Sequence, residues 1–128
     1  MDDSAMKHGA FGWFELMTND VEGAKTFYKD LFGWEYETIP STCSEYTVVK
    51  QNGEAVAGIM QMPEELAGMP PSWGIYITVD DVDKTVEETT ARGGKVLRPG
   101  TDIPDVGRFC VVQDKQGAVL MAISYTKK

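Results

Sequence analysis

The sequence predicts an α+β fold in which two βαβββ modules lie in one chain of 128 residues. Three observations predict it. Residues 13–36 read as a strand, a capped helix and the start of another strand. A fainter copy of this segment returns in the second half of the chain. In each copy the helix ends at glycine and is followed by three short strand-like runs. Repeats of this kind indicate one supersecondary unit used twice, here over about 9–62 and 73–125.

The first module begins with a strand over 10–17 and a helix over 20–32. Asp20 is a helix-capping residue, because its side-chain oxygen can accept from the free N–H groups of the first turn. Gly33 is placed to end the helix. The helix carries one broad apolar stripe at helical spacing: Ala24, Phe27, Tyr28, Leu31 and Phe32.

Three further strands complete the first module, over 34–39, 45–50 and 54–62. The last two should form a hairpin, because the Asn52-Gly53 pair between them tolerates the positive φ angles of a tight turn. Gly58 lies inside the last strand. A glycine in that position indicates a close approach to the backbone or a β-bulge.

Residues 63–72 contain three prolines and one glycine and form the connector between the modules. In the second module Asp81-Val82-Asp83 repeats Asp20-Val21-Glu22, and Gly94 repeats Gly33. The expected order is a strand, a capped helix, a strand, a loop and two strands. These elements cover 73–79, 82–92, 95–98, 99–106, 107–113 and 118–125.

Each module should form a four-stranded sheet with its helix on one face. Two such sheets can face each other as a curved, partly closed mixed sheet around a cavity, which is the usual setting for a small ligand.

Composition excludes several classes of protein. The net charge of −8 argues against nucleic acid, since phosphate binding needs clustered Lys and Arg. No apolar run approaches the roughly 20 residues of a membrane span, and the N-terminus has no signal-peptide pattern. We therefore expect a cytoplasmic protein. Cys43 and Cys110 are expected to be reduced thiols, and His8, the one histidine, a surface residue.

Four segments resemble the vicinal oxygen chelate superfamily, which includes glyoxalases, bleomycin-resistance proteins and extradiol dioxygenases. They are TFYKDLFGW, TVDDVD, DIPDVGRF and QDKQGAVL. The resemblance covers about residues 9–125 and implies paired modules and a homodimer. It does not imply one reaction, because the same scaffold serves isomerases, dioxygenases, epoxide-opening transferases and drug-sequestering proteins.

Metal-dependent members of this superfamily hold their cation with His, Gln or Glu on the first and last strand of each module. The resemblance maps these positions to Trp13, Met60, Gly74 and Met121, and a shift of one residue recovers only Gln61. None of these four residues suits a hard divalent cation. We therefore expect no metal and no other cofactor.

Period-two alternation places Trp13 and Glu15 on one strand face. The ligand-binding residues predicted from alternation and the resemblance are Trp13, Glu15, Met60, Trp73, Tyr76, Arg108 and Met121. An aromatic, methionine-rich surface of this kind fits a flat or apolar small molecule. The alternative is that the same side chains are packed core.

Glu15 is the candidate catalytic residue, because a carboxylate on a buried strand face needs a partner or a function. It could be a general base, or it could pair structurally with Arg108.

Three candidate functions follow from these observations. The first is a metal-free protein that binds a small molecule. The second is a lyase, isomerase or hydroxylase-like enzyme with Glu15 as base and Arg108 or Tyr76 as electrostatic partner. The third is an interaction module without a ligand.

Overall fold

A computed structural model describes most of the chain, namely residues 6–39, 46–62, 68–103 and 106–125. By residue contacts it forms two compact units. Unit 1 comprises Trp13–Gly74, and unit 2 comprises the residues up to Gly12 and those from Ile75 onward.

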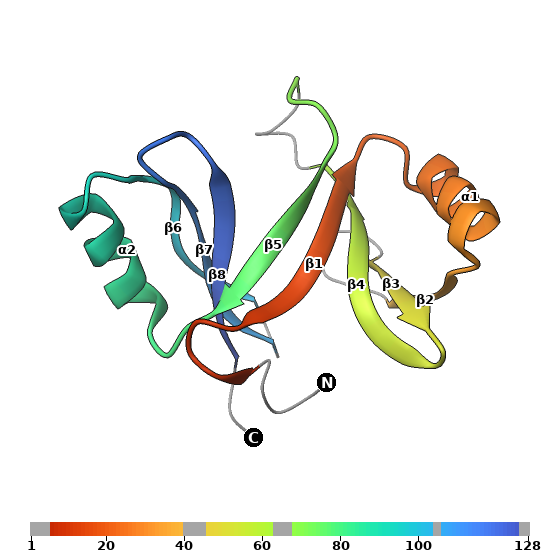
Figure 1. The fold of residues 1–128 in the computed structure, drawn as a ribbon, viewed down its shortest axis with the longest axis horizontal. Helices are drawn as coiled ribbons and strands as arrows, with labels where there is room; N and C mark the ends of the chain where they lie inside the picture. Colours follow the sequence, from red (N-terminus) through yellow and green to blue (C-terminus); the bar gives the residue numbers. More distant parts are fainter. Residues whose placement is uncertain (1–5, 40–45, 63–67, 104–105, 126–128) are drawn as a thin grey trace. The chain divides into compact units, whose positions relative to one another are not determined.

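Unit 1 contains one helix and a four-stranded sheet (Figure 1). The sheet has the strand order β2-β3-β4-β1, with β1 parallel to β4 and the other neighbours antiparallel. The predicted βαβββ order is confirmed. The elements are β1 Phe11–Thr18, α1 Val21–Phe32, β2 Glu35–Ile39, β3 Tyr46–Gln51 and β4 Glu54–Gln61.

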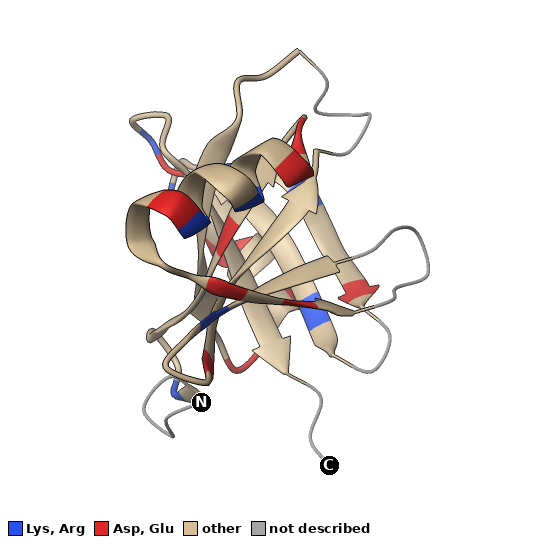
Figure 2. Cartoon of the chain, turned by 90° about the vertical axis from the view of Figure 1, so that its right-hand side faces the viewer, with Lys and Arg blue, Asp and Glu red and all other residues tan. Residues whose placement is uncertain are grey.

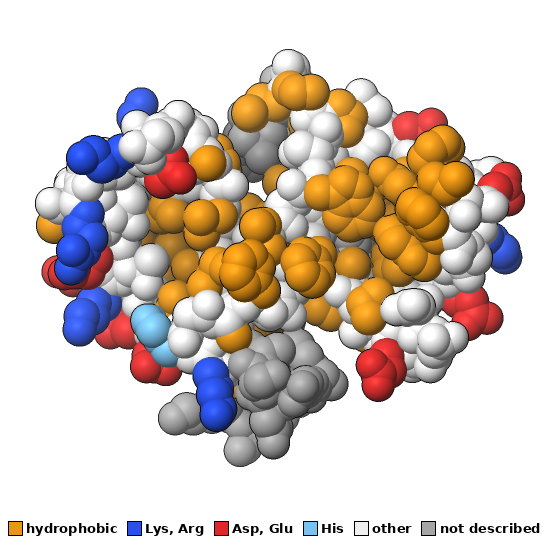
Figure 3. All heavy atoms as spheres, in the orientation of Figure 1, with side chains coloured by type: hydrophobic (Ala, Val, Ile, Leu, Met, Phe, Trp, Pro, Cys, Tyr) orange, Lys and Arg blue, Asp and Glu red, His pale blue; other side chains and the backbone are white. Residues whose placement is uncertain are grey.

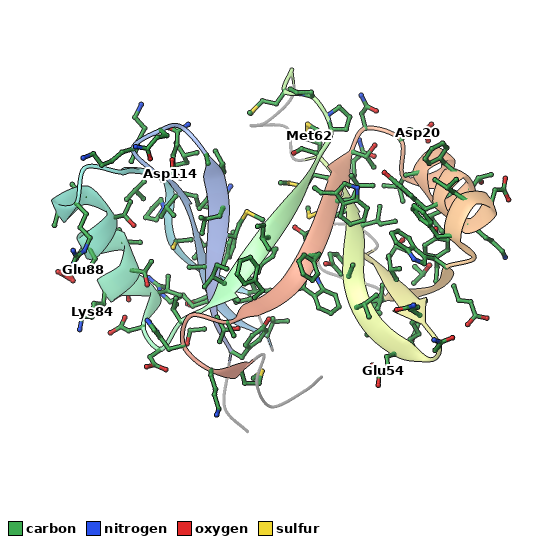
Figure 4. The ribbon with its side chains drawn as sticks, viewed as in Figure 1. Asp20, Glu54, Met62, Lys84, Glu88 and Asp114 are labelled. Carbon is green, nitrogen blue, oxygen red and sulfur yellow. The ribbon has the colours of Figure 1, made fainter. Side chains whose placement is uncertain are left out.

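The ends of α1 are set by the two predicted residues. The backbone N–H of Gly23 donates to Oδ1 of Asp20 over 2.9 Å, and Figure 4 shows Asp20 at the start of this helix. At the other end Gly33 adopts a left-handed conformation, and its N–H donates to the carbonyl oxygen of Lys29 over 2.8 Å. Both caps satisfy backbone groups that a helix leaves without internal partners.

One face of the unit 1 sheet packs against α1. Its core consists of Leu16, Val49, Ala57 and Ile59, against which apolar residues of α1 such as Ala24 pack. Because neighbouring residues of a strand point to opposite faces, the residues between these core positions lie on the sheet face away from α1. That second face carries the candidate site.

Unit 2 repeats the design with the strand order β5-β8-β7-β6, in which β5 is parallel to β8. Asp81 caps its helix by accepting from the N–H of Lys84 over 3.1 Å. The buried core lies between helix and sheet and includes Val82, Cys110 and Ala122. The elements are β5 Ser72–Thr78, whose residues up to Gly74 belong to unit 1, α2 Val82–Ala91, β6 Lys95–Ile103, β7 Gly107–Gln113 and β8 Val119–Tyr125.

The predicted loop over 99–106 is wrong for its first half, because β6 continues to Ile103. Proline has no N–H to donate and is tolerated at the edge of a sheet. β6 is the last strand in the order, and its register with β7 shifts between Arg98 and Thr101. This irregularity accommodates Pro99 without ending the strand.

Other predictions have mixed outcomes. Asn52 and Gly53 both have positive φ, as predicted for the hairpin turn. The predicted surface position of His8 is confirmed, and its Nδ1 accepts from the N–H of Asp80 over 3.0 Å. Cys43 and residues 63–67 of the connector lie outside the described residues. Of the helices in the described part, none is long and apolar enough to cross a bilayer. The cavity enclosed by the two sheets stays a prediction.

Cys110 should be chemically inert in the folded protein. Its side chain is fully buried, and burial raises the pKa of its thiol above the ordinary value of 9.0. Because the thiolate is the reactive form, we expect no labelling by a disulfide reagent at neutral pH in a Cys43→Ser variant until denaturant is added. Because the thiol of the unfolded chain loses its proton at a lower pH than the buried thiol, the folded state loses stability as the pH rises from 9.0 toward the raised pKa. Rapid labelling of the folded variant would contradict this prediction.

Candidate functional site

The candidate site is the face of the unit 1 sheet that points away from α1. Leu16 and Ile59 point toward the helix, so alternation along the strands places their neighbours on this second face. These residues come from β1, β3 and β4: Trp13, Glu15, Met17, Tyr46, Val48, Gly58 and Met60. The predicted site residues of the first module, Trp13, Glu15 and Met60, therefore share one surface.

Glu15 is buried on this face, with 5% of its surface exposed. The Tyr46 hydroxyl donates to its Oε2 atom over 2.8 Å. The same hydroxyl oxygen accepts from the indole Nε1–H of Trp13 over 3.0 Å. Trp13 and Tyr46 are both half-buried. The three side chains form a continuous hydrogen-bonded group, which we call the Trp13–Tyr46–Glu15 chain.

Gly58 provides the space for this chain. It lies directly opposite Glu15 on β4, and a Cβ atom built on it would overlap the Tyr46 hydroxyl group. The predicted close approach at Gly58 is therefore confirmed, with a phenol as the approaching group. The irregularity in this hairpin lies instead on β3, between Val49 and Lys50.

The positions to which the resemblance maps the family's metal ligands carry side chains of other chemistry. Met60 lies opposite Met17, and thioether sulfur is a poor ligand for a hard divalent cation. Trp13 donates its N–H to Tyr46 and has no acceptor atom to offer a cation. In the described part of the chain, His, Cys, Asp and Glu side chains form no cluster of three or more that could hold a metal ion. The residues at these positions do not fit the family's metal centre.

Unit 2 carries a different group at the equivalent place. Its strand ladders have the same register as those of unit 1. By this register, Glu15, Tyr46 and Gly58 correspond to Tyr76, Phe109 and Met121. Where unit 1 has a hydrogen-bonded acid, unit 2 has two aromatic rings with centroids 6.5 Å apart. The predicted residues Tyr76 and Met121 thus lie together on the sheet face away from α2.

Arg108 lies on the α2 side of its sheet. Its guanidinium donates to Oδ1 of Asp83 through Nε and Nη2, and to Oδ1 of Asp102 through Nη1 over 2.9 Å. The hydrogen bonds that Arg108 donates to Asp83 and then to Asp102 raise the pKa of its guanidinium group. Arg108 thus has two carboxylate partners within its own unit. The suggested pairing of Arg108 with Glu15 stays a prediction.

Trp73 lies away from Trp13, in an aromatic group beside α1. Its indole N–H donates to the Tyr28 hydroxyl over 3.2 Å, and its ring lies 6.0 Å from that of Trp34. Apolar side chains gather over α1 in Figure 3. On this helix the Phe27 side chain is 60% exposed. The charged residues of the helix are distributed along its length in Figure 2. Trp73 thus belongs to this exposed aromatic surface.

Sequence reasoning missed Tyr46. It is separated from Glu15 by 31 positions, and its strand was recognised only as β-branched and aromatic. One signal could have found it. Gly58 removes a side chain from the strand between Glu15 and Tyr46, and only an aromatic group from β3 is long enough to use that space.

Two βαβββ units, each with a capped helix on one face of a four-stranded sheet, define a paired-module α+β protein. The chain belongs to the Glyoxalase/Bleomycin resistance protein/Dioxygenase superfamily, whose family model matches residues 10–121.

Relatives from bacteria and a fungus support this assignment. CFP32 of Mycobacterium tuberculosis is 42% identical over 120 residues, which cover 91% of this chain and 46% of CFP32. The anthracycline biosynthesis protein DnrV of Streptomyces peucetius is 29% identical, over 86% of this chain and 45% of its own. The chain thus spans about half the length of these two relatives. A glyoxylase-like domain-containing protein of Didymella fabae is 32% identical, with 86% and 89% covered.

Solved structures share the fold. A methylmalonyl-CoA epimerase from Streptomyces coelicolor superposes with a TM-score of 0.67 at 15% identity, covering 94% of this chain and 100% of that chain. The corresponding epimerase from Mycobacterium tuberculosis gives a TM-score of 0.62 at 14% identity, over 90% and 87% of the two chains. At this level of identity the likeness concerns the fold alone.

Proposed function

We propose that this protein binds a flat, largely apolar small molecule on the unit 1 sheet face away from α1, without a divalent metal. The observation that carries the proposal is the buried Glu15 carboxylate, held by Tyr46 beside the Trp13 indole. Binding sites for small molecules combine an apolar lining with a few fixed polar groups. This face has that composition.

Each residue type has a physical part in such a site. The Trp13 ring offers a flat surface for stacking. Met17 and Met60, which lie opposite each other on β1 and β4, have flexible thioether side chains that adapt to irregular shapes. Glu15 supplies the polar contact that orients the ligand. The net charge of −8 attracts cationic ligands over neutral or anionic ones.

A second function is supported by the same carboxylate. A buried Glu close to a bound substrate could act as general base in an isomerase, lyase or hydroxylase-like reaction. The two functions are separated by following a bound compound chromatographically. Unchanged compound after prolonged incubation indicates binding alone, whereas conversion that Glu15→Gln abolishes indicates catalysis.

The binding proposal is tested with a panel of flat compounds. It includes acridine, its cationic diamino derivative proflavine and, because one relative is named for anthracycline biosynthesis, an anthracycline. A ligand of the native state raises the melting temperature by mass action, and a ligand at Trp13 should quench tryptophan fluorescence. We expect both effects with at least one compound. Both should be weaker in a Trp13→Leu variant than in the wild type.

Two results would contradict the proposal. The absence of any thermal shift across the panel would favour an interaction module that has no small ligand. Stoichiometric binding of Mn²⁺, Ni²⁺ or Zn²⁺, detected by calorimetry and lost in Glu15→Gln, would overturn the metal-free part.

A further inference from the structure

We propose that Tyr46 is a positioning residue that fixes Glu15 as a hydrogen-bond acceptor, so that the site selects ligands whose facing group donates hydrogen bonds. Such a group is an ammonium, an amine or a hydroxyl. The inference rests on the proposed function and adds the chemistry of the ligand to it.

The direction of the Trp13–Tyr46–Glu15 chain follows from its first member. An indole N–H can only donate, so the Tyr46 oxygen must accept from Trp13 over the observed 3.0 Å. The hydroxyl proton of Tyr46 is then directed along its other hydrogen bond, to Oε2 of Glu15 over 2.8 Å. Trp13 thereby favours donation of the Tyr46 hydroxyl proton toward Glu15.

Gly58 keeps the chain in this geometry. It pairs with Glu15 on one side and with Val48 on the other, so it lies between the strands that carry the acid and the phenol. Because a Cβ atom would overlap the Tyr46 hydroxyl, the ring reaches Glu15 across β4 only at this glycine. The phenol is therefore held by the backbone below it as well as by its two hydrogen bonds.

The carboxylate selects its ligand by what it can accept. An ionised Glu side chain accepts several hydrogen bonds and donates none. If the ligand placed a hydrogen-bond acceptor against this carboxylate, two acceptors would face each other with no proton between them. That contact is unfavourable on an apolar face. A donor or cation there gains a charge-assisted hydrogen bond. The corresponding residues of unit 2, Tyr76, Phe109 and Met121, contain no such acceptor charge.

Proflavine and acridine form a matched pair of probes, because they share one ring system and differ in amino groups and charge. We expect wild-type protein to bind proflavine more tightly than acridine. Tyr46→Phe removes one oxygen atom and should weaken proflavine binding about tenfold while changing acridine binding less than about twofold. Tyr28→Phe is the control, because it removes a hydroxyl group that likewise accepts a hydrogen bond from an indole, in this case the indole of Trp73.

A nitrogen–proton correlation spectrum tests the hydrogen bonds independently of any ligand. In Tyr46→Phe the indole N–H signal of Trp13 should move and that of Trp73 should stay. Tyr28→Phe should give the reverse. An unmoved Trp13 signal in Tyr46→Phe would overturn the positioning role.

The ligand experiment distinguishes this inference from the function on which it rests. If wild-type protein binds both probes equally, or if Tyr46→Phe weakens both equally, donor selection is overturned while ligand binding stands. If wild-type protein binds acridine but not proflavine, donor selection is also overturned. No binding of any compound contradicts the proposed function itself, and the indole signals still decide the role of Tyr46.

Discussion

Replacing Glu15 by Gln is expected to weaken proflavine binding about ten- to a hundredfold, because a charge-assisted hydrogen bond is worth about 1.5–3 kcal/mol. The fold should persist, since the amide oxygen of Gln can still accept from the Tyr46 hydroxyl. Acridine, which has no amino group, should bind both proteins with similar affinity. Fluorescence titration of the two probes against the two proteins measures all four affinities.

Glu54→Gln is the matched control for this experiment. It makes the same change of charge in the same unit, at an exposed residue beside the β3–β4 turn (Figure 4). A loss of proflavine affinity in Glu54→Gln as large as that in Glu15→Gln would show a general effect of net charge. Wild-type affinity in Glu15→Gln would remove Glu15 from the site.

Gly58→Ala is expected to reduce the free energy of unfolding by about 1–3 kcal/mol, because the new methyl group displaces the Tyr46 phenol from the buried Glu15. The sign is informative. In an unobstructed strand this substitution normally stabilises, since alanine loses less backbone entropy on folding than glycine. Urea denaturation followed by tryptophan fluorescence measures the change. Proflavine affinity should fall as it does in Tyr46→Phe.

A double-mutant cycle assigns this loss to Tyr46. In a Tyr46→Ala background the ring is absent, so Gly58→Ala should cost little or become stabilising. We expect a coupling energy of at least about 1 kcal/mol between the two positions, as for other residues in direct contact. Strictly additive effects would show that the phenol does not occupy the space above Gly58.

The helices could be predicted from the sequence because their signals are local. Asp20 and Gly33 mark the two ends of α1, and both act through atoms within four residues. The extent of β6 could not be predicted in the same way. Pro99 and Gly100 normally indicate a loop, and only the neighbouring strand β7, with its shifted register, continues the pairing through them.

The candidate site was predicted in part. Alternation along β1 correctly placed Trp13 and Glu15 on one face, because this depends only on the pleat of a strand. The contact between Glu15 and Tyr46 depends on the pairing of three strands, so the sequence alone could not reveal it. Trp73 shows the converse. Its place beside Gly74, a position that the resemblance assigns to the metal site, suggested a ligand-binding role, and the structure adds its packing against Tyr28 beside α1.

The close contact between Gly58 and the Tyr46 phenol also constrains which residue pairs these two positions can hold. Positions 46 and 58 should covary in an alignment of relatives. A tyrosine at 46 requires glycine at 58, and a larger residue at 58 requires an aromatic ring without the hydroxyl. Unit 1 has Tyr46 with Gly58, and at the equivalent positions by strand register unit 2 has Phe109 and Met121. These two positions would thus have to change together, because a single substitution at either one would be disfavoured.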